Sequence, residues 1–501
     1  MNISLLLEMI CDAAPDRIAV TGADCRLTYR QLHDGARALA LSLAQEPPGA
    51  IVYLAENHPA AAIVLFGAAL GGRAYVPINY RLNGHEIEAL LHRAAPVLVV
   101  TDREVTGYAT LSPADLAAQG ALPTDVVLAD VSADSVAVEL FTSGTTGAPK
   151  AALLRHAHLM SYILGTVEFL GADEQDSALV CVPPYHIAGI SALLSSVYAG
   201  RRIVLLPAFT PETWLGLAAQ ERVTSAFLVP TMLQRIVAHV ADHPQAAQVP
   251  SLQAVAYGGG RMPRETIAAA MVLWPQVNFT NAYGLTETSS TICLLTPEDH
   301  RAAAALADDP ERCRLGAVGK PVPGIELVIL DDAGQPAGPG VVGLVHVRGG
   351  QVAGEYREGG QRLGDEGWFC TRDLGWLDAE GYLFLDGRAD DVIVRGAENI
   401  SPGEIVDVLR AHPDVADAAV FGVPDSEWGE AVAAAIVPTD GRQVSAGTLQ
   451  ELVRAALRSS RVPQHVRFVE ALPYNEMGKL LRRALRDAFA AECTSTDGVG
   501  N

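Results

Sequence analysis

The feature that most constrains the fold of this chain is the alternation of short β-branched runs with apolar helical segments. Helical periodicity covers 27–44, and an apolar stretch at 60–70 predicts a buried helix. Strand-like runs occur at 51–55, 95–102, 201–209, 224–230 and 251–260. Because this alternation is typical of sheets covered by helices on both faces, it predicts a layered α/β fold.

The texture of the sequence changes after about residue 315. A stretch rich in Gly and Pro with short strands predicts a small β-rich subdomain at about 315–388. Strand-like runs at 419–424, 431–438 and 465–472 and a helix at 448–460 then predict a compact α+β unit. We therefore expect two unequal domains, 1–388 and 389–501, joined near 387–391.

One helix start in the second domain is marked by its residues. Ser401 is the expected N-cap, Pro402 the first helical residue, and Glu404 the partner that completes a capping box.

Charge and composition exclude several classes of function. The 501 residues include 58 Asp and Glu against 36 Lys and Arg, a formal net charge of −22, and no basic run. A chain this acidic has no general attraction to nucleic acid or to anionic lipid. Neither is expected as a partner.

Other sequence features point to the cytoplasm. Seven scattered cysteines without a C-x-x-C pair are typical of reduced thiols rather than of disulfides or a zinc site. The amino end lacks a basic region, so no signal peptide is expected. The stretch 178–200 has no charged residue, but its prolines and polar side chains favour a buried strand, a loop and a core helix over a membrane span.

Lysine is rare, and each lysine is therefore informative. It occurs only at Lys150, Lys320 and Lys479, while arginine supplies all other side-chain positive charge apart from histidine. A lysine kept in such a chain is a candidate for a role that needs a compact ammonium group, although chance survival explains any one of them equally well. Lys320 is expected to be structural or at the surface.

The stretch 140–150, LFTSGTTGAPK, is the first candidate site. Its hydroxyls, its unhindered backbone N–H groups and Lys150 suit the binding of phosphate oxygens. The spacing is not that of a P-loop, because Gly144 and Gly147 are only three apart and Pro149 precedes the lysine. A P-loop kinase is therefore disfavoured.

This string resembles the signature loop of the adenylate-forming superfamily, which includes acyl-CoA synthetases, peptide-synthetase adenylation domains and luciferases. Further motifs of that superfamily follow in order: YHIAG (185–189), YGGG (257–260), AYGLTET (282–288), GWFCTRD (367–373), GRADDVIVRGAENISPGEI (387–405) and NEMGK (475–479). The resemblance covers nearly the whole chain and is strongest to a stand-alone acyl-CoA synthetase. It implies a large N-terminal domain of layered α/β subdomains and a small mobile C-terminal α+β domain.

The resemblance implies an ATP-dependent acid–thiol ligase. Such an enzyme activates a carboxylic acid as acyl-AMP, releases pyrophosphate, and transfers the acyl group to coenzyme A, with ATP, Mg²⁺ and coenzyme A as cofactors. The alternative is an adenylation enzyme that loads a separate carrier protein. A family member that has lost ligase activity is a third possibility, but its expected losses, at Glu287, Asp373 or Lys479, are not seen.

The resemblance also implies roles for individual residues. Tyr283 would stack on adenine, Thr286 would bond the α-phosphate or the substrate carboxylate, and Glu287 would bind Mg²⁺. Asp373 would accept both ribose hydroxyls, supported by Arg388. The full set expected to bind ATP or AMP is Thr142, Ser143, Gly144, Thr145, Thr146, Gly147, Lys150, Gly258, Gly259, Tyr283, Asp373 and Arg388.

The two half-reactions would use different residues of the C-terminal part. Lys479 would bridge the carboxylate and the α-phosphate during adenylation, so that the expected catalytic residues are Lys479, Thr286 and Glu287. Asp390 occupies the hinge position of the family. Gly396 would line the tunnel for the thiol arm of coenzyme A, where a missing side chain leaves room.

The acyl pocket would be built around His186, Gly189 and Gly260. Apolar and small walls suit an uncharged aliphatic or aromatic monocarboxylate and not the ammonium group of an amino acid. Arg261 stands where the family often has proline, and we expect it at the surface.

The chain departs from the family at Arg372, where the usual T-G-D is T-R-D. If the glycine position requires a positive φ, arginine is strained there. The alternative, which we favour, is an ordinary φ and a side chain that points outward.

Overall fold

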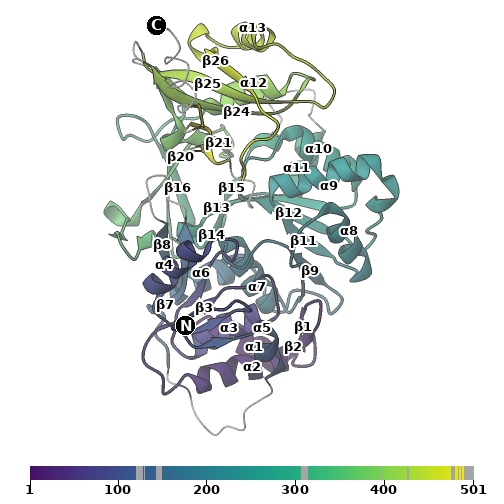
Figure 1. The fold of residues 1–501 in the computed structure, drawn as a ribbon, viewed down its shortest axis with the longest axis vertical. Helices are drawn as coiled ribbons and strands as arrows, with labels where there is room; N and C mark the ends of the chain where they lie inside the picture. The colour runs from purple at the N-terminus through teal and green to yellow at the C-terminus, as the bar shows by residue number, and fades with distance from the viewer. Residues whose placement is uncertain are drawn as a thin grey trace. The chain divides into compact units, whose positions relative to one another are not determined.

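The computed structural model describes residues 1–119, 128, 130–142, 149–305, 314–395, 398–425, 428–475, 480–482, 484–486, 488 and 489. It divides into two units: Met1–Leu327 with Val347–Phe369, and Val328–His346 with Cys370–Asn501. Figure 1 traces the chain through both. The domain boundary at 388/389 and the hinge at Asp390 stay predictions.

The first unit is built on two large sheets. A nine-stranded sheet has the order β15 (Lys320–Pro321), β14 (Ser290–Leu295), β13 (Asn278–Leu285), β12 (Ala254–Gly258), β11 (Ser225–Leu228), β9 (Ser177–Val180), β10 (Arg202–Leu205), β1 (Ile18–Thr21) and β2 (Arg26–Thr28). Its strands from β1 to β13 run parallel, while β2, β14 and β15 join antiparallel at the two edges. Parallel strands of this kind read as continuous apolar runs because both faces are buried.

An eight-stranded sheet forms the other half of this unit. Its order is β19 (Gly360–Gln361), β18 (Glu355–Tyr356), β8 (Lys150–Arg155), β7 (Val136–Thr142), β4 (Tyr75–Pro77), β3 (Ala50–Tyr53), β5 (Pro96–Val100) and β6 (Thr110–Leu111). The strands from β7 to β6 are parallel, and β7, β8, β18 and β19 pair antiparallel in succession.

Helices fill the space between the two sheets and cover their outer faces. Helix α1 (Ser4–Ala13) contacts both α3 (Ala60–Leu70), which lies on β3 and β4, and α7 (Ile187–Ala199), which lies on β9 and β10. The helix predicted at 60–70 is α3 itself, and nearly all of its residues are buried, as expected for a helix that is apolar all round. The other helices are α2 (Tyr29–Ser42), α4 (Gly84–Ala94), α5 (Pro113–Ala118), α6 (His156–Thr166), α8 (Pro211–Gln220), α9 (Pro230–Asp242), α10 (Arg264–Leu273) and α11 (Pro297–Ala304).

Two smaller sheets follow. The β-rich subdomain contains a four-stranded sheet of β16 (Ile325–Leu330), β17 (Gly343–Gly349), β20 (Phe369–Leu377) and β21 (Leu383–Arg388). The last sheet has the order β23 (Glu398–Ile400), β22 (Ile393–Arg395), β25 (Gly429–Pro438) and β24 (Val415–Asp425), with β26 (His465–Phe468) beside β25. The layered α/β part, the β-rich part and the α+β part predicted from the sequence are confirmed.

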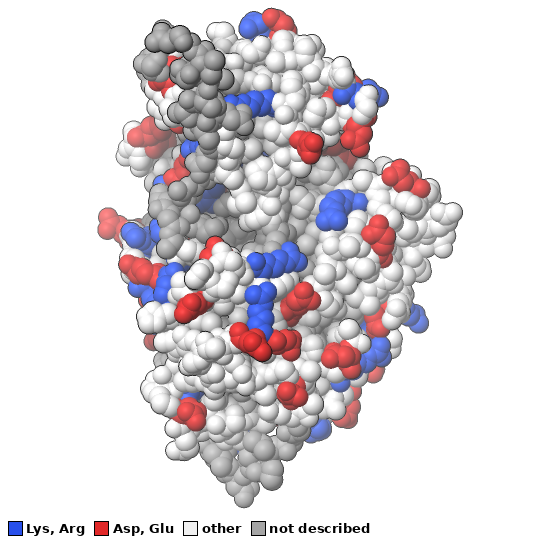
Figure 2. Space-filling view, viewed as in Figure 1, with Lys and Arg blue, Asp and Glu red and all other residues white. Residues whose placement is uncertain are grey.

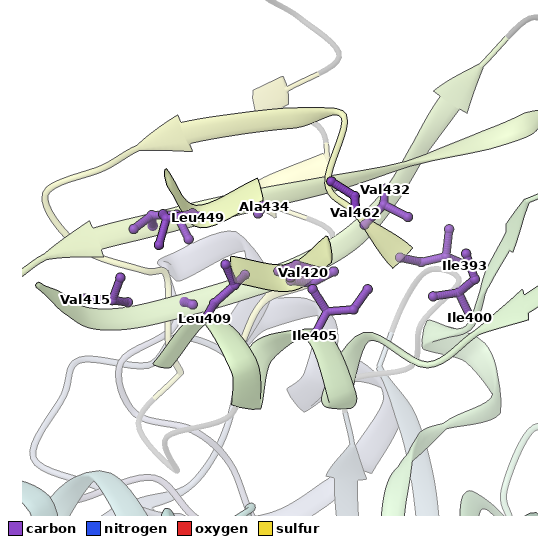
Figure 3. Packing of buried hydrophobic residues seen from close by; sticks show 13 residues of the cluster. Ile393, Ile400, Ile405, Leu409, Val415, Val420, Val432, Ala434, Leu449 and Val462 are labelled. Atoms are coloured by element: carbon purple, nitrogen blue, oxygen red, sulfur yellow. The ribbon is translucent and has the colours of Figure 1, made fainter. Parts of the chain in front are cut away.

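The last sheet has a core on each face. Helices α12 (Pro402–Arg410) and α13 (Ala446–Ala456) pack on one face through Ile405, Leu409, Leu449 and Val453. Figure 3 shows Ile405, Leu409 and Leu449 in this cluster. The opposite face carries Phe421 and its neighbours, which pack against Leu472, Leu485 and Phe489. Alternation of side chains along β24 therefore supplies two separate apolar layers.

The start of α12 is partly as predicted. Ser401 is the N-cap and Pro402 the first residue, but Ser401 makes no side-chain cap bond and its Oγ donates to the Asp386 carbonyl at 2.6 Å. Glu404 pairs with Arg461 instead of the N-cap. The predicted capping box is wrong, because both side chains have tertiary partners.

Two expectations from the sequence concern the distribution of surface charge and the possibility of a membrane-spanning helix. On the face seen in Figure 2, Lys and Arg side chains lie singly or in small groups among Asp and Glu. Among the described helices, none is both long and apolar enough to cross a membrane. The uncharged stretch at 178–200 forms β9, a loop and α7, as predicted.

Candidate functional site

Three of the sequence motifs meet at the carboxyl edge of the nine-stranded sheet. The loop with His186 follows β9, Gly258 ends β12, and Tyr283 to Glu287 close β13. Since β9, β11, β12 and β13 are parallel, these ends lie along the same edge. Ligands of open α/β sheets bind at this edge.

Gly258 is required by the close approach of β12 to β13. It pairs with Ala282, and a Cβ at Gly258 would lie 2.2 Å from the Ala282 carbonyl oxygen. The next residue, Gly259, has a φ of +82°, which disfavours any side chain. The glycine run therefore keeps backbone, rather than side chains, beside Ala282 and Tyr283.

The turn after β13 is strained and firmly held. Ser289 and Ser290 have φ of +55° and +115°, conformations that non-glycine residues rarely adopt. Thr288 Oγ1 bonds the Ser290 carbonyl at 2.8 Å, and the buried Gln351 amide donates to the Thr288 and Thr291 carbonyls at 3.0 and 2.8 Å. Such over-determined strain is common at functional sites.

His186 is the N-cap residue of α7, and its imidazole is neutral. Burial lowers the pKa of His186 to about 4. Its ring centroid lies 4.6 Å from that of Tyr185. Gly189 leaves the helix room to start, since a Cβ there would be 2.8 Å from the Pro183 carbonyl oxygen. The segment can serve as an uncharged wall but is a poor general base at neutral pH.

The two ends of the predicted phosphate loop lie side by side. Thr142 pairs with Lys150 in the antiparallel β7–β8 ladder, and Thr142 Oγ1 donates to the Lys150 carbonyl at 3.3 Å. Lys150 Nζ is 5.9 Å from the centroid of the Tyr356 ring. The predicted residues between these ends, Ser143, Gly144, Thr145, Thr146 and Gly147, lie outside the described residues.

Tyr356 is a residue that sequence reasoning missed. Its hydroxyl donates a hydrogen bond to Glu287 Oε1. The Glu287 carbonyl accepts hydrogen bonds from the backbone N–H groups of Ala353 and Gly354 at 2.8 and 3.1 Å. Tyr356 therefore contacts both Glu287 and Lys150, two residues that the sequence places in separate motifs.

The ion pair between Glu139 and Arg357 was also missed. Glu139 lies on β7 with a side chain that is 0% exposed, and Arg357 Nε is 2.9 Å from its Oε1. Burial raises the pKa of Glu139, and the Arg357 guanidinium lowers it in part. A glutamate in an otherwise apolar strand, VAVELFT, was the one available signal for it.

Asp373 and Arg388 are neighbours in the four-stranded sheet. They face each other in the β20–β21 ladder, and Arg388 Nη1 is 3.3 Å from Asp373 Oδ1. Asp373 is buried, and its backbone N–H donates to Thr371 Oγ1 at 3.1 Å. The expected pairing of these two residues is present.

Arg372 corrects one expectation. Its φ is +63°, so the position does adopt the left-handed conformation that favours glycine. The favoured expectation of an ordinary φ is wrong, whereas the side chain is exposed at 62%. The guanidinium forms an ion pair with Asp390, the predicted hinge residue, in the one-turn helix Ala389–Asp391. Asp390 accordingly has a partner that the family pattern does not supply.

Some of the other predicted site residues are described by the structure and others are not. Thr286 is half-buried in the 3₁₀ turn Thr286–Thr288, and Gly260 lies next to Pro230, with a Cβ at Gly260 falling 3.6 Å from it. Arg261 and Lys320 are exposed, as expected. Gly396 and Lys479 lie outside the described residues.

The donor set suits a magnesium ion held mainly by a nucleotide. Glu287 Oε1 accepts the Tyr356 hydrogen bond, and its second carboxylate oxygen is a hard ligand of the kind that Mg²⁺ prefers. Mg²⁺ is usually bound by one or two carboxylates together with substrate phosphates, and Glu287 fits that pattern.

A second group of possible metal ligands, Asp24, Cys25 and His58, lies elsewhere. His58 Nδ1 accepts from the Ala60 N–H at 3.1 Å, so that the ring proton is on Nε2, which faces Asp24 at 3.3 Å. This arrangement is a His–Asp hydrogen bond. It does not offer a free ring nitrogen to a metal.

Relatives of the chain match it over most of its length. It is 32% identical over 487 residues to the fatty acid–[acyl-carrier-protein] ligase ScoC of Streptomyces coeruleorubidus, covering 92% of each chain. It is 32% identical over 492 residues to a feruloyl-CoA synthase of Amycolatopsis sp, covering 95% of this chain and 96% of the relative.

A solved structure agrees with these relatives. The fold superposes with a TM-score of 0.81 and 29% identity on o-succinylbenzoate CoA synthetase from Bacillus subtilis in complex with its acyl-adenylate intermediate, covering 96% of this chain and 98% of that one. The same enzyme has been solved with ATP and magnesium ion. Residues 7–357 match the AMP-binding enzyme family and residues 404–479 match the AMP-binding enzyme C-terminal domain. The chain belongs to the AMP-binding enzyme family.

Proposed function

We propose that this protein is an ATP-dependent acid–CoA ligase. It activates a carboxylic acid by attack of the carboxylate on the α-phosphate of ATP, releases pyrophosphate, and then transfers the acyl group from AMP to the thiol of coenzyme A. The proposal is supported by membership of the family and by the CoA ligases among the relatives. We also propose that the protein is cytoplasmic, in keeping with the free cysteines among the described residues.

One observation carries the proposal. Lys150 and Glu287 come from separate motifs and both contact Tyr356. Joining a carboxylate to a triphosphate brings anions together, so a site for it needs a cation and a metal-binding carboxylate close to one another. These two residues supply both.

The remaining roles are those that the family resemblance implies. Tyr283 on β13 stacks on adenine, Thr286 bonds the α-phosphate or the carboxylate, and Glu287 holds Mg²⁺, which draws charge from the phosphates. Asp373, whose carboxylate is oriented by Arg388, accepts the ribose hydroxyls. Lys479 completes adenylation, and Gly396 lines the path of the thiol arm.

The substrate is an uncharged aliphatic or aromatic monocarboxylate. His186 supports this class, because a half-buried imidazole whose pKa is lowered to about 4 carries no charge at neutral pH. Gly189 and Gly260, which the resemblance places in the same pocket, would contribute no side chain to it. A pocket with such walls gives no partner to the ammonium group of an amino acid.

A second acceptor is favoured by one observation. ScoC, 32% identical over 92% of the chain, is a ligase for an acyl-carrier protein. The alternative is therefore that the acyl group passes to the phosphopantetheine thiol of a separate carrier protein rather than to coenzyme A.

A panel of carboxylic acids tests both points. The purified full-length chain is incubated with ATP, Mg²⁺ and each acid, and pyrophosphate release is measured before any thiol is added. We expect acid-dependent release with aliphatic or aromatic acids and little with amino acids. Addition of coenzyme A should then give a thioester, whereas a thioester formed only with a carrier protein supports the alternative. Absence of acid-dependent pyrophosphate release with every acid contradicts the proposal.

A further inference from the structure

The strand that carries Tyr356 is unusually well fixed. Tyr356 pairs with Ala152 of β8, and the Arg357 N–H donates to the Ala151 carbonyl at 2.9 Å. Each neighbouring side chain bonds a different element. Glu355 forms two bonds with Arg155 at 2.8 and 2.9 Å, while Glu358 pairs with Arg93 and accepts from the Ala151 N–H at 3.3 Å.

We call Glu355, Tyr356, Arg357, Glu358 and their partners the β18 network. Within it, Arg357 is held by the buried Glu139 of β7. The position of Tyr356 is therefore fixed by contacts to β7, β8 and α4 before any ligand binds. A residue fixed in this way can orient others.

Glu287 is held at two points by the same stretch of chain. Its carbonyl is bound by the N–H groups of Ala353 and Gly354, and its carboxylate by the Tyr356 hydroxyl. A hydrogen bond from a hydroxyl to a carboxylate is short and strong, and it limits rotation of the carboxylate. With Oε1 accepting this hydrogen bond, the second oxygen of Glu287 keeps both of its lone pairs for a cation.

The ring of Tyr356 has a second neighbour. Lys150 Nζ lies 5.9 Å from its centroid, within the range of a cation–π contact. One side chain thus touches both the carboxylate of the AYGLTET motif and the lysine that follows the Ser/Thr/Gly-rich loop.

We propose that Tyr356 is a positioning residue for the magnesium–nucleotide complex. Its hydroxyl orients the Glu287 carboxylate for the cation, and its ring holds the Lys150 ammonium near the phosphates. This inference rests on the proposed function and goes beyond it, because it assigns the assembly of the site to a residue outside the motifs.

Two substitutions separate the two contacts. Tyr356→Phe removes the bond to Glu287 and keeps the ring under Lys150, whereas Tyr356→Leu removes both. Tyr162→Phe on α6 is the matched control. Binding of a non-hydrolysable ATP analogue is measured by calorimetry with Mg²⁺ and with EDTA, so that the readout does not depend on turnover.

We expect Tyr356→Phe to weaken analogue binding about tenfold with Mg²⁺, the loss of one charge-assisted hydrogen bond, and to leave binding in EDTA unchanged. Tyr356→Leu should weaken binding in EDTA as well. In steady-state assays Tyr356→Phe should raise the Mg²⁺ requirement and leave the KM for the acid unchanged. In a Glu287→Gln background the effect of Tyr356→Phe should disappear.

Equal losses with Mg²⁺ and EDTA for Tyr356→Phe, or an undiminished effect in the Glu287→Gln background, would overturn the inference. If Tyr356→Leu fails to fold, Tyr356→Phe alone decides. Failure of the proposed function is seen separately, as an unsubstituted protein that binds the analogue without regard to Mg²⁺ and releases no pyrophosphate.

Discussion

The β18 network and the turn at Ala389–Asp391, which we call the junction turn, both depend on ion pairs but place them differently. In the β18 network Glu139 is 0% exposed, so that its charge has no water to solvate it. At the junction turn Arg372 is 62% exposed and pairs with Asp390, and Arg482 pairs with Asp391 at 2.8 Å.

This difference in exposure predicts that the two regions respond differently to loss of a charged partner and to salt. A buried charge depends on its partner, because removal of the partner leaves an uncompensated charge in a low dielectric. An exposed pair contributes little to stability and is screened by salt. The β18 network is therefore suited to fix geometry, whereas the exposed ion pair of the junction turn contributes little to stability.

The strongest expected effect of burial concerns a histidine of the first unit. His156, the first residue of α6, is 0% exposed, and its Nδ1 accepts from the Ile3 N–H at 3.4 Å. Burial and then the chain's amino terminus lower the pKa of His156 to about 4 from 6.5. Between these values the unfolded chain binds more protons, so the free energy of unfolding falls as the pH is lowered, by about 3 kcal/mol in all.

Urea unfolding of the protein and of His156→Leu at pH 4 to 7 measures this contribution. The substitution should flatten the pH dependence, whereas the control His85→Leu, at an exposed position, should not. The same slope in all three proteins would show that His156 does not titrate as a buried group.

The next largest effect on the free energy of unfolding is expected from breaking the ion pair between Glu139 and Arg357. Arg357→Met leaves Glu139 without its partner and should lower the free energy of unfolding by about 2 kcal/mol at pH 7 to 8. Because burial raises the pKa of Glu139 and Arg357 opposes this, the variant raises that pKa further. The loss should therefore shrink as the pH falls and the carboxyl becomes protonated.

Thermal unfolding at pH 8 and pH 5 measures this loss, and Arg362→Met, at an exposed position in the same stretch, is the control. The double variant Glu139→Gln/Arg357→Met should recover most of the stability. An equal loss at both pH values would contradict the assignment of a buried charge.

The smallest effect is expected at the junction turn. Arg372→Gly loses an exposed ion pair worth less than about 1 kcal/mol but relieves a left-handed backbone that costs about as much. The midpoint of thermal unfolding should change by less than about 2 °C. Hydrogen exchange of the amides at 389–395 should instead become faster, and Asp390→Asn should act in the same way.

The double variant Arg372→Gly/Asp390→Asn should exchange no faster than Asp390→Asn alone, and high salt should reproduce its effect in the unsubstituted protein. Additive effects of the two substitutions would show that the pair does not restrain the turn. A large loss of stability would place the junction turn with the β18 network after all.

Much of the fold could be predicted because it depends on local patterns. A helix formed by the stretch 60–70 is apolar on every side and is therefore expected to be buried. Runs of β-branched residues such as 224–230 mark buried strands. The start of α12 at Pro402 was recognisable from its cap, but the capping box was not, since the Asp386 carbonyl and Arg461 compete for Ser401 and Glu404. Tertiary partners of this kind leave no periodic signal.

The candidate site was predictable in its motifs and not in its assembly. Glu287 and Lys150 were found through their motifs, whereas Tyr356 lies in a stretch rich in glycine and charge without a distinctive pattern. The backbone of Arg372 was misjudged for a related reason. An arginine in a left-handed conformation is unfavourable locally, and its partner Asp390 becomes visible only when β20 and β21 are paired.

The two apolar layers of the last sheet have a consequence for the stability of this part of the chain. Helices α12 and α13 cover one face of the sheet, and Leu472, Leu485 and Phe489 cover the other, so that both apolar faces are buried. Among the described residues, the burial of both faces of this sheet is therefore supplied by residues of the second unit itself, and does not depend on side chains of the first unit.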